Sequence, residues 1–457
     1  MREPSGSSAA GSAAAAGLNA YLLRSSVVAA LGGLLFGFDT AVIAGTTRAL
    51  TDSYSLTPAL LGFTVASALW GTVLGSLFAG APSDRYGRLA SLRALAILYV
   101  VTALGCGFAW DWNSLVVFRF IGGLAIGGSS VIGPMYIAEI APAARRGRLV
   151  ALFQFNIVAG ILLAYLSNYL IGLADSGAAE WRWKLGVAAV PSALFFAALF
   201  GIPQSPRWLV RNGRTAEARQ VLERIGEPEP EAAVRDIVES VTVERSGRSE
   251  ALFSRKYRFP VFLAVSIGMF NQLSGINAIL YYLNDIFERA GFSKVSSDLQ
   301  AVAIGLTNLV CTILAMAVID QFGRKKMLLT GAAGTATCLA GVAWVFASGR
   351  NEGLLVWLLV AFIGFFAFSQ GAVIWVYLSE VFPNLVRAKG QSLGSFTHWI
   401  MNAMISAVFP LLAETSGAAP FVFFSAMTVV QFFVVLFVFP ETKGVTLEAM
   451  QKELEKR

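Results

Sequence analysis

The stretch "SDRYGR", Ser83 to Arg88, occurs a second time in altered form as "IDQFGR", Ile319 to Arg324. The offset between the two copies, counted from Asp84 to Asp320, is 236 residues. Two further pairs repeat at offsets of 241 and 237 residues: "EIAPAARR" from Glu139 with "EVFPNLVR" from Glu380, and "PQSPR" from Pro203 with "PETK" from Pro440. Three motifs that share nearly one period indicate an internally duplicated chain.

The composition indicates an integral membrane protein. Of 457 residues, 56% are hydrophobic and 14% are charged, and the mean hydropathy is +0.66, which is far from the balance of a soluble domain. Stretches apolar enough to cross about 30 Å of hydrocarbon begin near Leu22, Pro58, Leu89, Leu115, Leu149, Leu185, Phe259, Leu299, Met327, Leu354, Gln391 and Phe421. We therefore predict an all-α membrane protein with twelve transmembrane helices, which the duplication arranges as two six-helix bundles.

The longest polar segment separates six of these stretches from the other six. Within it, Val234, Ile237, Val238 and Val241 have the spacing of one apolar helix face, so we expect short amphipathic helices beneath the bundles. The predicted organisation is a flexible tail at 1–20, a first bundle at 21–202, a cytoplasmic helical linker at 203–257, a second bundle at 258–440 and a cytoplasmic tail at 441–457.

The positions of lysine and arginine predict the topology. With both termini in the cytoplasm, Arg119 lies within a span and the outer loops hold six of the 35 basic residues: Arg48, Arg182, Lys184, Arg289, Lys294 and Arg350. The remaining 28 lie on the cytoplasmic side, as the positive-inside rule requires of a multi-pass protein of the cell membrane. The net charge of +7 is therefore a topology signal and indicates no nucleic-acid partner. The three cysteines fall within spans and lack metal-site spacing.

Several motifs, in the same order, resemble the sugar porter family of the major facilitator superfamily. They are "DRYGR", "PMYIAEIAP" from Pro134, "PQSPRWL" from Pro203, "QLSGINAILYY" from Gln272 and the closing "PETKG" from Pro440. The resemblance covers nearly the whole chain after the tail. It implies a bacterial proton-linked monosaccharide transporter that works by alternating access, acts as a monomer and draws on the proton gradient without a cofactor.

The duplicated loops carry acids and bases near the predicted cytoplasmic ends of the helices. Topology and helix capping explain any one of these charges about as well as a functional role does. In sugar porters the matching residues form charge networks that close the cytoplasmic side, and each partly hydrated pair contributes at most about 1 kcal/mol. The resemblance thus implies a cytoplasmic gate in which Asp84 accompanies Arg88, Glu139 accompanies Arg146, and the second half repeats this with Asp320, Arg324, Glu380 and Arg387.

The stretch "NQLSGINAILYY", Asn271 to Tyr282, places amides inside an apolar span, where unpaired polar groups are costly. On a straight helix the side chains of Gln272 and Asn277 would point about 140° apart. Ser274 and Gly275 lie between them, and transporter helices that break at glycine commonly line a central cavity. We therefore predict a broken helix that directs both amides to one ligand; the alternative is that the amides bind neighbouring helices.

Other polar or amphipathic groups are predicted at a similar depth: Gln154, Asn308, Trp375, His398, Trp399 and Asn402. Amides and indoles with almost no charge suit a neutral polyol, since amides both donate and accept and an indole face covers the C–H side of a sugar ring. The resemblance implies sugar contacts at Gln154, Gln272, Asn277, Asn308 and Trp375, with Tyr281 at a gating position. Asn271 stands where many members have glutamine.

Two positions depart from the usual pattern of the family. Ala372 replaces the usual proline of the tenth span, which leaves the kink of that helix open. His398, the only histidine, reads more readily as an interior hydrogen-bonding residue than as a proton relay. It resembles a position at which relatives contact substrate with Gln or Asn, and its presence in some fructose-carrying relatives suggests a ketohexose.

Two charges lie within predicted spans: Asp39 in "FGFDTAVIAG" and Arg119 in "VVFRFIGG". An isolated charge at mid-span costs about 2.5–3.5 kcal/mol on insertion scales, so we predict that each is the partner of the other. The pair is either a structural ion pair or a proton-coupling pair. Proton-linked sugar porters carry an acid at this position of the first span, and this resemblance favours coupling.

We therefore expect a secondary active transporter that imports a neutral hexose or pentose, together with a proton. A proton-independent facilitator is the nearest alternative, and a non-transporting sugar sensor is a more distant one. An organic-anion exchanger is disfavoured because Arg119 is the only mid-span cation. No nucleophile–base arrangement, metal cluster or phosphate loop indicates an enzyme.

Overall fold

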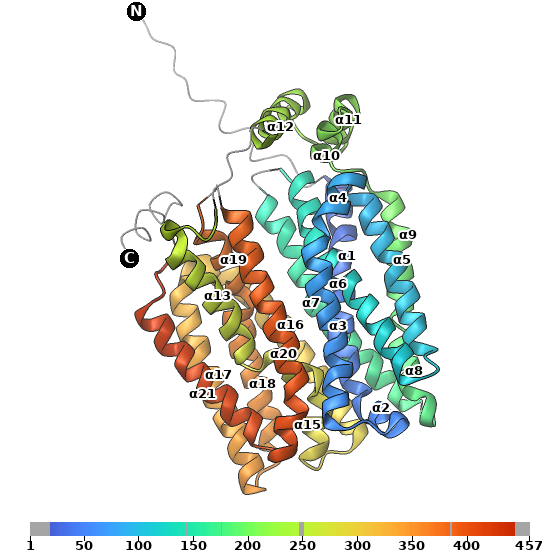
Figure 1. Cartoon of the computed structure of the whole chain (residues 1–457), viewed down its shortest axis with the longest axis vertical. Coiled ribbons are helices and arrows are strands. Elements are labelled where there is room, and N and C mark those ends of the chain that lie inside the picture. The colour runs from blue at the N-terminus through green and yellow to red at the C-terminus, as the bar shows by residue number, and fades with distance from the viewer. Residues whose placement is uncertain (1–18, 143–144, 175, 246–250, 384–385, 444–457) are drawn as a thin grey trace, which may run out of the picture.

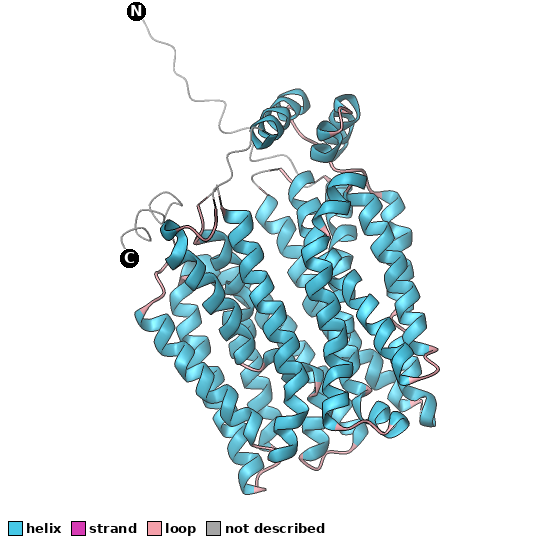
Figure 2. Ribbon diagram, viewed as in Figure 1, coloured by secondary structure: helices cyan, strands magenta, loops and turns pink. Residues whose placement is uncertain are grey.

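A computed structural model describes residues 19–142, 145–174, 176–245, 251–383 and 386–443, without the side chains of 243–245, 320 and 388. Two groups of long helices stand side by side, and a smaller helical group lies above one end (Figure 1). The described part of the chain is helical apart from its turns and loops (Figure 2). Twelve of its helical stretches are long and apolar enough to cross a membrane, which confirms the predicted all-α class and the twelve spans. The predicted tails fall almost wholly outside the described residues.

The first bundle contains six spans. They are α1 (Ala20–Val42) with the 3-10 turn η1 (Ile43–Gly45), α3 (Pro58–Phe78), α5 (Arg88–Gly107), α6 (Trp112–Ile140), α7 (Arg146–Leu173), and a sixth made of η2 (Gly177–Ala179), α8 (Glu180–Gly186), α9 (Ala189–Ala198) and η3 (Leu199–Gly201). The short helices α2 (Thr47–Tyr54) and α4 (Gly80–Tyr86) lie in the connections. Helix α6 begins at a capping box in which Asp111 and Ser114 satisfy each other's backbone N–H.

The second bundle repeats this arrangement. Its spans are η4 (Arg255–Tyr257) with α13 (Arg258–Leu273) and α14 (Ile276–Tyr281), then α16 (Lys294–Phe322), α17 (Arg324–Ser348), α18 (Leu354–Phe366) with η5 (Ala367–Gly371) and α19 (Ala372–Glu380), α20 (Arg387–Thr415) and α21 (Ala419–Phe437). The short helix α15 (Leu283–Arg289) follows α14. Spans predicted from apolar stretches alone begin up to several residues late, because polar and basic residues form many of the first helical turns.

Three short helices form the linker: α10 (Pro206–Arg211), α11 (Thr215–Ile225) and α12 (Pro230–Arg245). They lie above one end of the bundles (Figure 1), which we name the linker end; the opposite end, where α2, α8 and α15 lie, is the far end. Val234 and Ile237 of α12 pack against the cluster around Trp208, and Val241 is buried. Val238, predicted on the same face, is instead 40% exposed, because the buried face of α12 is narrower than the sequence pattern suggested.

The duplicated glycines Gly87 and Gly323 have the same role in the two halves. Their φ angles are +95° and +89°, a region that L side chains rarely adopt. Each glycine immediately precedes a span, Gly87 before α5 and Gly323 before α17. The repeated motif therefore encodes the same sharp turn twice.

The seventh span is broken where the sequence predicts. Helix α13 ends at Leu273, Gly275 has a φ of +80°, and α14 begins at Ile276. A Cβ atom at Gly275 would lie only 2.2 Å from the ring of Phe424. Glycine is thus required here both for its backbone angle and for its size.

The tenth span is also irregular, although it lacks the usual proline at Ala372. Five residues, Ala367–Gly371, form a π-helical turn between α18 and α19. Such a turn inserts an extra residue into the helix and changes the direction of the side chains that follow. The tenth span therefore departs from a regular α-helix just before Ala372, without a proline at that position.

The two bundles meet mainly through two pairs of helices, α3 with α20 and α7 with α16. A Cβ atom at Gly62, near the far end of α3, would lie 2.1 Å from the carbonyl oxygen of Ala407 in α20. The hydroxyl of Tyr165 in α7 donates to the carbonyl oxygen of Leu280 in α14, at 2.8 Å. These approaches place the tight contact between the bundles in the half of the molecule nearer the far end.

We predict that Gly275→Ala lowers stability more than Gly349→Ala. Both glycines have positive φ, but nothing lies within 4 Å of a Cβ at Gly349. The backbone term is about 1–2 kcal/mol for each variant, and overlap with Phe424 adds about 1–3 kcal/mol only at Gly275. Thermal unfolding of the purified variants in detergent measures the difference. Equal midpoints would show that the ring of Phe424 moves aside freely.

Candidate functional site

A cluster of amides surrounds the break between α13 and α14, with Gln272 at its centre. Its Nε2 donates to Oδ1 of Asn271 at 2.9 Å and lies 3.2 Å from Nδ1 of His398 in α20. Asn277 Nδ2 donates to Gln272 Oε1 at 3.1 Å. The broken helix therefore brings Gln272 and Asn277 together, which a straight helix would prevent.

A second group of polar contacts lies along α20. Asn402 donates from Nδ2 to the hydroxyl of Tyr281 at 3.2 Å, and Ser406 donates to Oδ1 of Asn402 at 3.2 Å. Asn402 and Tyr281 are 1% and 3% exposed. Because both residues are buried and paired, Tyr281 is held in one orientation against α20.

Aromatic rings extend the amide cluster in a row. The ring of Trp375 in α19 lies 5.3 Å from that of His398, and His398 lies 5.2 Å from Trp399 in a perpendicular arrangement. Trp399 in turn lies 5.2 Å from Phe36 of α1 in the first bundle. Trp399 is buried, whereas Trp375 is 39% exposed. The row therefore runs from an accessible indole to the contact between the bundles.

Gln154 and Asn308 are placed differently. They lie on α7 and α16, the helices that pack against each other across the bundles. Among the described residues neither side chain forms a hydrogen bond to another residue, although Asn308 is only 8% exposed. The structure thus does not join them to the cluster around Gln272, and no other described residue uses their donors and acceptors.

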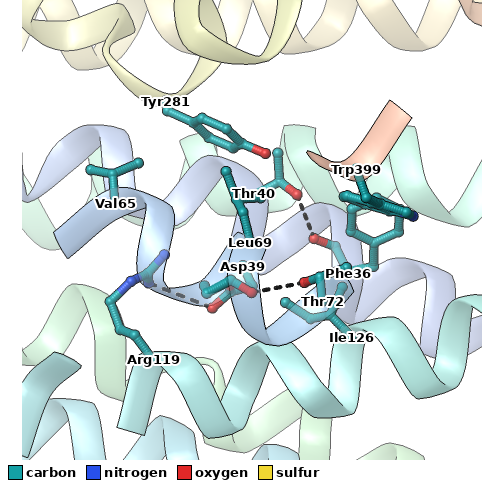
Figure 3. Close-up of a pocket in the computed structure, with 11 residues that line it drawn as sticks. Phe36, Asp39, Thr40, Val65, Leu69, Thr72, Arg119, Ile126, Tyr281 and Trp399 are labelled. Atoms are coloured by element: carbon teal, nitrogen blue, oxygen red, sulfur yellow. Dashed lines mark hydrogen bonds and ion pairs between the residues drawn. The ribbon is translucent and has the colours of Figure 1, made fainter. Parts of the chain in front are cut away.

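Asp39 and Arg119 are partners, as the sequence predicts. Asp39 Oδ1 lies 3.7 Å from Arg119 Nη1, and the side chains are 32% and 3% exposed, respectively. They line a cavity that has room for about one water molecule. Figure 3 shows Tyr281 and Trp399 lining the same cavity. Two residues of the second bundle, Tyr281 and Trp399, therefore line the cavity of the ion pair and also contact the polar residues of α20.

At the linker end, Arg88 is the centre of a buried ion-pair group. Its guanidinium contacts Glu139 at 2.9 Å and Asp84 at 2.8 Å and donates to the carbonyl oxygen of Ser83. Glu139 also accepts from the hydroxyl of Ser205. Asp84 accepts from Arg211 of α10 at 3.1 Å, so the linker is tied to the first bundle.

The second bundle contains an equivalent group. Arg324 contacts Glu380 at 2.8 Å, and Glu380 accepts from the hydroxyl of Thr442 at 2.6 Å. A neighbouring hydrogen bond is repeated as well: the hydroxyl of Tyr136 donates to the carbonyl oxygen of Pro203, and that of Tyr377 donates to the carbonyl oxygen of Pro440. The three repeated sequence motifs thus converge in space in each half.

The predicted partners within these groups were wrong in one respect. Glu139 binds Arg88 rather than Arg146, and Glu380 binds Arg324 rather than Arg387. Arg146 is exposed, and the Nε of Arg387 donates to the carbonyl oxygen of Phe382. The physical reason is that α5 and α17, which begin with Arg88 and Arg324, start beside the ends of α6 and α19, which carry Glu139 and Glu380. Arg146 and Arg387 are nearer to these acids in sequence, but they do not pair with them. The side chain of Asp320 lies outside the described residues.

Sequence reasoning gave no role to Ser205, Thr442 or a group of charges at the far end. Lys184, Asp298, Glu180 and Lys294 form ion pairs with one another there. Their positions at the edges of predicted spans were the available signal, but the two lysines were counted as topology markers. No group of three or more His, Cys, Asp or Glu that could hold a metal occurs in the described ranges.

Comparisons with known proteins show the family and the fold of the chain. The family profile described as "Sugar (and other) transporter" matches residues 25–454. The arabinose-proton symporter of Bacillus subtilis strain 168 is 34% identical over 441 residues, 94% of this chain and 95% of the relative. The D-xylose-proton symporter of Escherichia coli strain K12 is 35% identical over 477 residues, 95% and 96% of the two chains. A solved structure described as the inward open conformation of the xylose transporter XylE from E. coli has a TM-score of 0.84 at 32% identity and covers 95% of this chain and 100% of that chain.

We predict that Arg88→Gln destabilises the protein strongly, whereas Arg146→Gln does not. Arg88 and Glu139 are 6% and 9% exposed, and breaking a buried pair strands a charge at a cost of about 3–5 kcal/mol. Arg146 is exposed, so its replacement should change stability by no more than about 0.5 kcal/mol. Thermal unfolding in detergent tests both variants, with Arg324→Gln as the counterpart in the second half. Similar midpoints for Arg88→Gln and Arg146→Gln would contradict the central role of Arg88.

Proposed function

The chain belongs to the family of sugar and other transporters, and on that premise we propose that it imports a neutral monosaccharide together with a proton. Family membership confirms the predicted sugar porter of the major facilitator superfamily, and a transporter rather than an enzyme. The named relatives are described as arabinose-proton and D-xylose-proton symporters. Proton-linked uptake of a hexose or pentose by alternating access is the function that best unites these relatives with the site.

The single observation that carries the sugar site is the amide group assembled at the broken helix. Gln272 contacts Asn271, Asn277 and His398 at once, and it offers an uncharged set of donors and acceptors of the kind that hydroxyl groups need. Trp375 adds a partly exposed indole face beside it. We assign the remaining sugar contacts to Gln154 and Asn308, whose amides bind no other described residue, and to Trp399 and Asn402 on α20.

The proton site is assigned to Asp39, with Arg119 as its partner. The carboxylate of Asp39 is one-third exposed and lies 3.7 Å from the buried guanidinium of Arg119, and proton-linked sugar porters carry an acid at this position of the first span. Tyr281 and Trp399 line the same cavity and connect it to the amide cluster. This arrangement supports coupling between sugar and proton.

The linker end is assigned to the cytoplasm, with both termini on that side. The tight contacts between the bundles lie toward the far end; with this orientation they would close the outer side, and the similarity to an inward open relative supports such a conformation. The charges around Arg88 and Arg324, together with Arg146, Arg387 and Asp320, are assigned to the cytoplasmic gate. The protein is proposed to act as a monomer, with the proton gradient as its energy source and no cofactor.

A proton-independent facilitator is the second candidate. It would use the same sugar site, while Asp39 and Arg119 would serve only as a structural ion pair. The distance of 3.7 Å between Asp39 Oδ1 and Arg119 Nη1 is longer than a close charge-assisted hydrogen bond. This distance argues against a purely structural ion pair. The coupling experiment below separates the two functions.

For the sugar site, we predict that Gln272→Ala and Trp375→Ala weaken sugar binding while the protein stays folded. Losing one hydrogen bond to a neutral ligand should cost about 0.5–1.5 kcal/mol of affinity, and more if a buried partner is stranded. Counterflow in proteoliposomes, with a panel of unlabelled hexoses and pentoses, measures affinity and identifies the sugar. Gln431→Ala is the matched control, since this buried glutamine of α21 forms no hydrogen bond to the cluster. Unchanged affinity in both site variants would move the sugar elsewhere.

For the proton, we predict that Asp39→Asn abolishes uphill sugar accumulation but preserves counterflow. The amide imitates the protonated carboxyl permanently, so the carrier still reorients with sugar but no longer binds a proton. Gradient-driven uptake and counterflow are measured in the same proteoliposomes, with exposed Asp52→Asn as the control. Accumulation driven by an imposed pH difference in Asp39→Asn would establish the structural ion pair and favour the facilitator.

A further inference from the structure

The far end of the molecule contains a network of charges that crosses between the bundles. Lys184 of α8, in the first bundle, contacts Asp298 of α16, in the second, at 3.2 Å, and Glu180 of its own helix at 2.8 Å. Its ammonium also donates to the carbonyl oxygen of Gly45 at 3.2 Å. Lys294 of α16 completes the network by reaching back to Glu180 at 2.6 Å. Positive and negative charges therefore alternate across the interface.

The centre of this network is removed from solvent. The side chains of Lys184 and Asp298 are 1% and 2% exposed, whereas Lys294 is 51% exposed. Nearby, Arg48 of α2 and Glu288 of α15 also pair across the bundles, but the side chain of Arg48 is 70% exposed. Water readily replaces Arg48 in this pair, although Glu288 is only 13% exposed, so the pair contributes less than the buried pair of Lys184 and Asp298.

Two amides beside the network are incompletely paired. Asn284 donates to Asp298 and Asn168 donates to the carbonyl oxygen of Val42, yet the Oδ1 atoms of both amides have no partner among the described residues. Water entering this region would satisfy both oxygens. The closed arrangement therefore gains the ion pairs and the open arrangement gains hydration, a balance suited to contacts that are repeatedly made and broken.

We propose that Lys184 and Asp298 form a latch that holds the extracellular end closed while the sugar site faces the cytoplasm. Separating the bundles at the far end requires the two charges to part and to be hydrated together. Removing one partner alone leaves the other buried and uncompensated, which penalises the closed state. Removing both leaves an apolar contact that closes without that penalty. The latch rests on the proposed alternating access but is independent of which sugar or proton site is used.

The test uses a thiol reporter at Ala301, which is 1% exposed. It lies between Asp298 and Gly305 on one face of α16, and Gly305 lies against Leu162 and Tyr165 of α7. Ala301→Cys is introduced after Cys106, Cys311 and Cys338 are replaced by alanine, and counterflow confirms that this parent still transports. A membrane-impermeant maleimide, added from outside to cells expressing the full chain, then reports opening of the far end.

Lys184→Met in this parent should raise the labelling rate roughly tenfold or more, because the buried Asp298 disfavours the closed state. Lys184→Met/Asp298→Leu should return the rate to near that of the parent. Arg48→Gln, which removes the exposed partner of Glu288, should raise the rate much less than Lys184→Met does. An unchanged rate in Lys184→Met overturns the proposal. So does an equal rise in the single and double variants with a matching loss of thermal stability, since that indicates packing alone. Labelling requires neither sugar nor proton, so failure of the latch would leave counterflow and the proposed function intact.

Discussion

Each bundle depends on one arginine that is almost completely enclosed by its own half of the chain. Arg88 joins the turn before α5, the end of α6 through Glu139, and the segment after the sixth span through Ser205. Arg324 does the same in the second half through Glu380 and Thr442. Removing one partner of a buried charge costs about 3–5 kcal/mol, so each group stabilises the linker end of its own bundle. Motion between the bundles must then take place at the contacts that cross the interface.

The break in the seventh span separates a helix that packs against its own bundle from a helix that also contacts the other bundle. Helix α13 packs against α19, α20 and α21 of its own bundle, whereas α14 also reaches α1 and η1 of the other. Gln272 and Asn277 lie on opposite sides of the break and are joined by a hydrogen bond. A ligand that binds both amides therefore bridges a segment fixed within one bundle and a segment that touches the other, and binding there bears directly on the contact between the halves.

Much of the fold and part of the candidate site could be predicted from the sequence, because they follow from local physical constraints. Twelve apolar stretches must be helical in hydrocarbon, two lone charges within spans require each other, and a glycine between two amides permits a break. The partners of Glu139 and Glu380 could not be predicted in this way. Proximity along the chain favoured Arg146 and Arg387, but Arg88 and Arg324 are brought near by helix packing. For the same reason Lys184 was interpreted as a loop charge, although the interface between the bundles buries it.

Tyr281 offers a route by which the proposed sugar site and the proposed proton site could act on each other without direct contact. It lies at the end of α14, receives a hydrogen bond from Asn402 of α20, and lines the cavity of Asp39 and Arg119. Because α14 begins at the break beside Gln272, a ligand that draws Asn277 toward α13 also shifts the segment that carries Tyr281. The cavity has room for about one water molecule, so even a small shift of Tyr281 would change the space beside Asp39. Coupling then requires only that α14 has two positions, one for each occupancy of the sugar site.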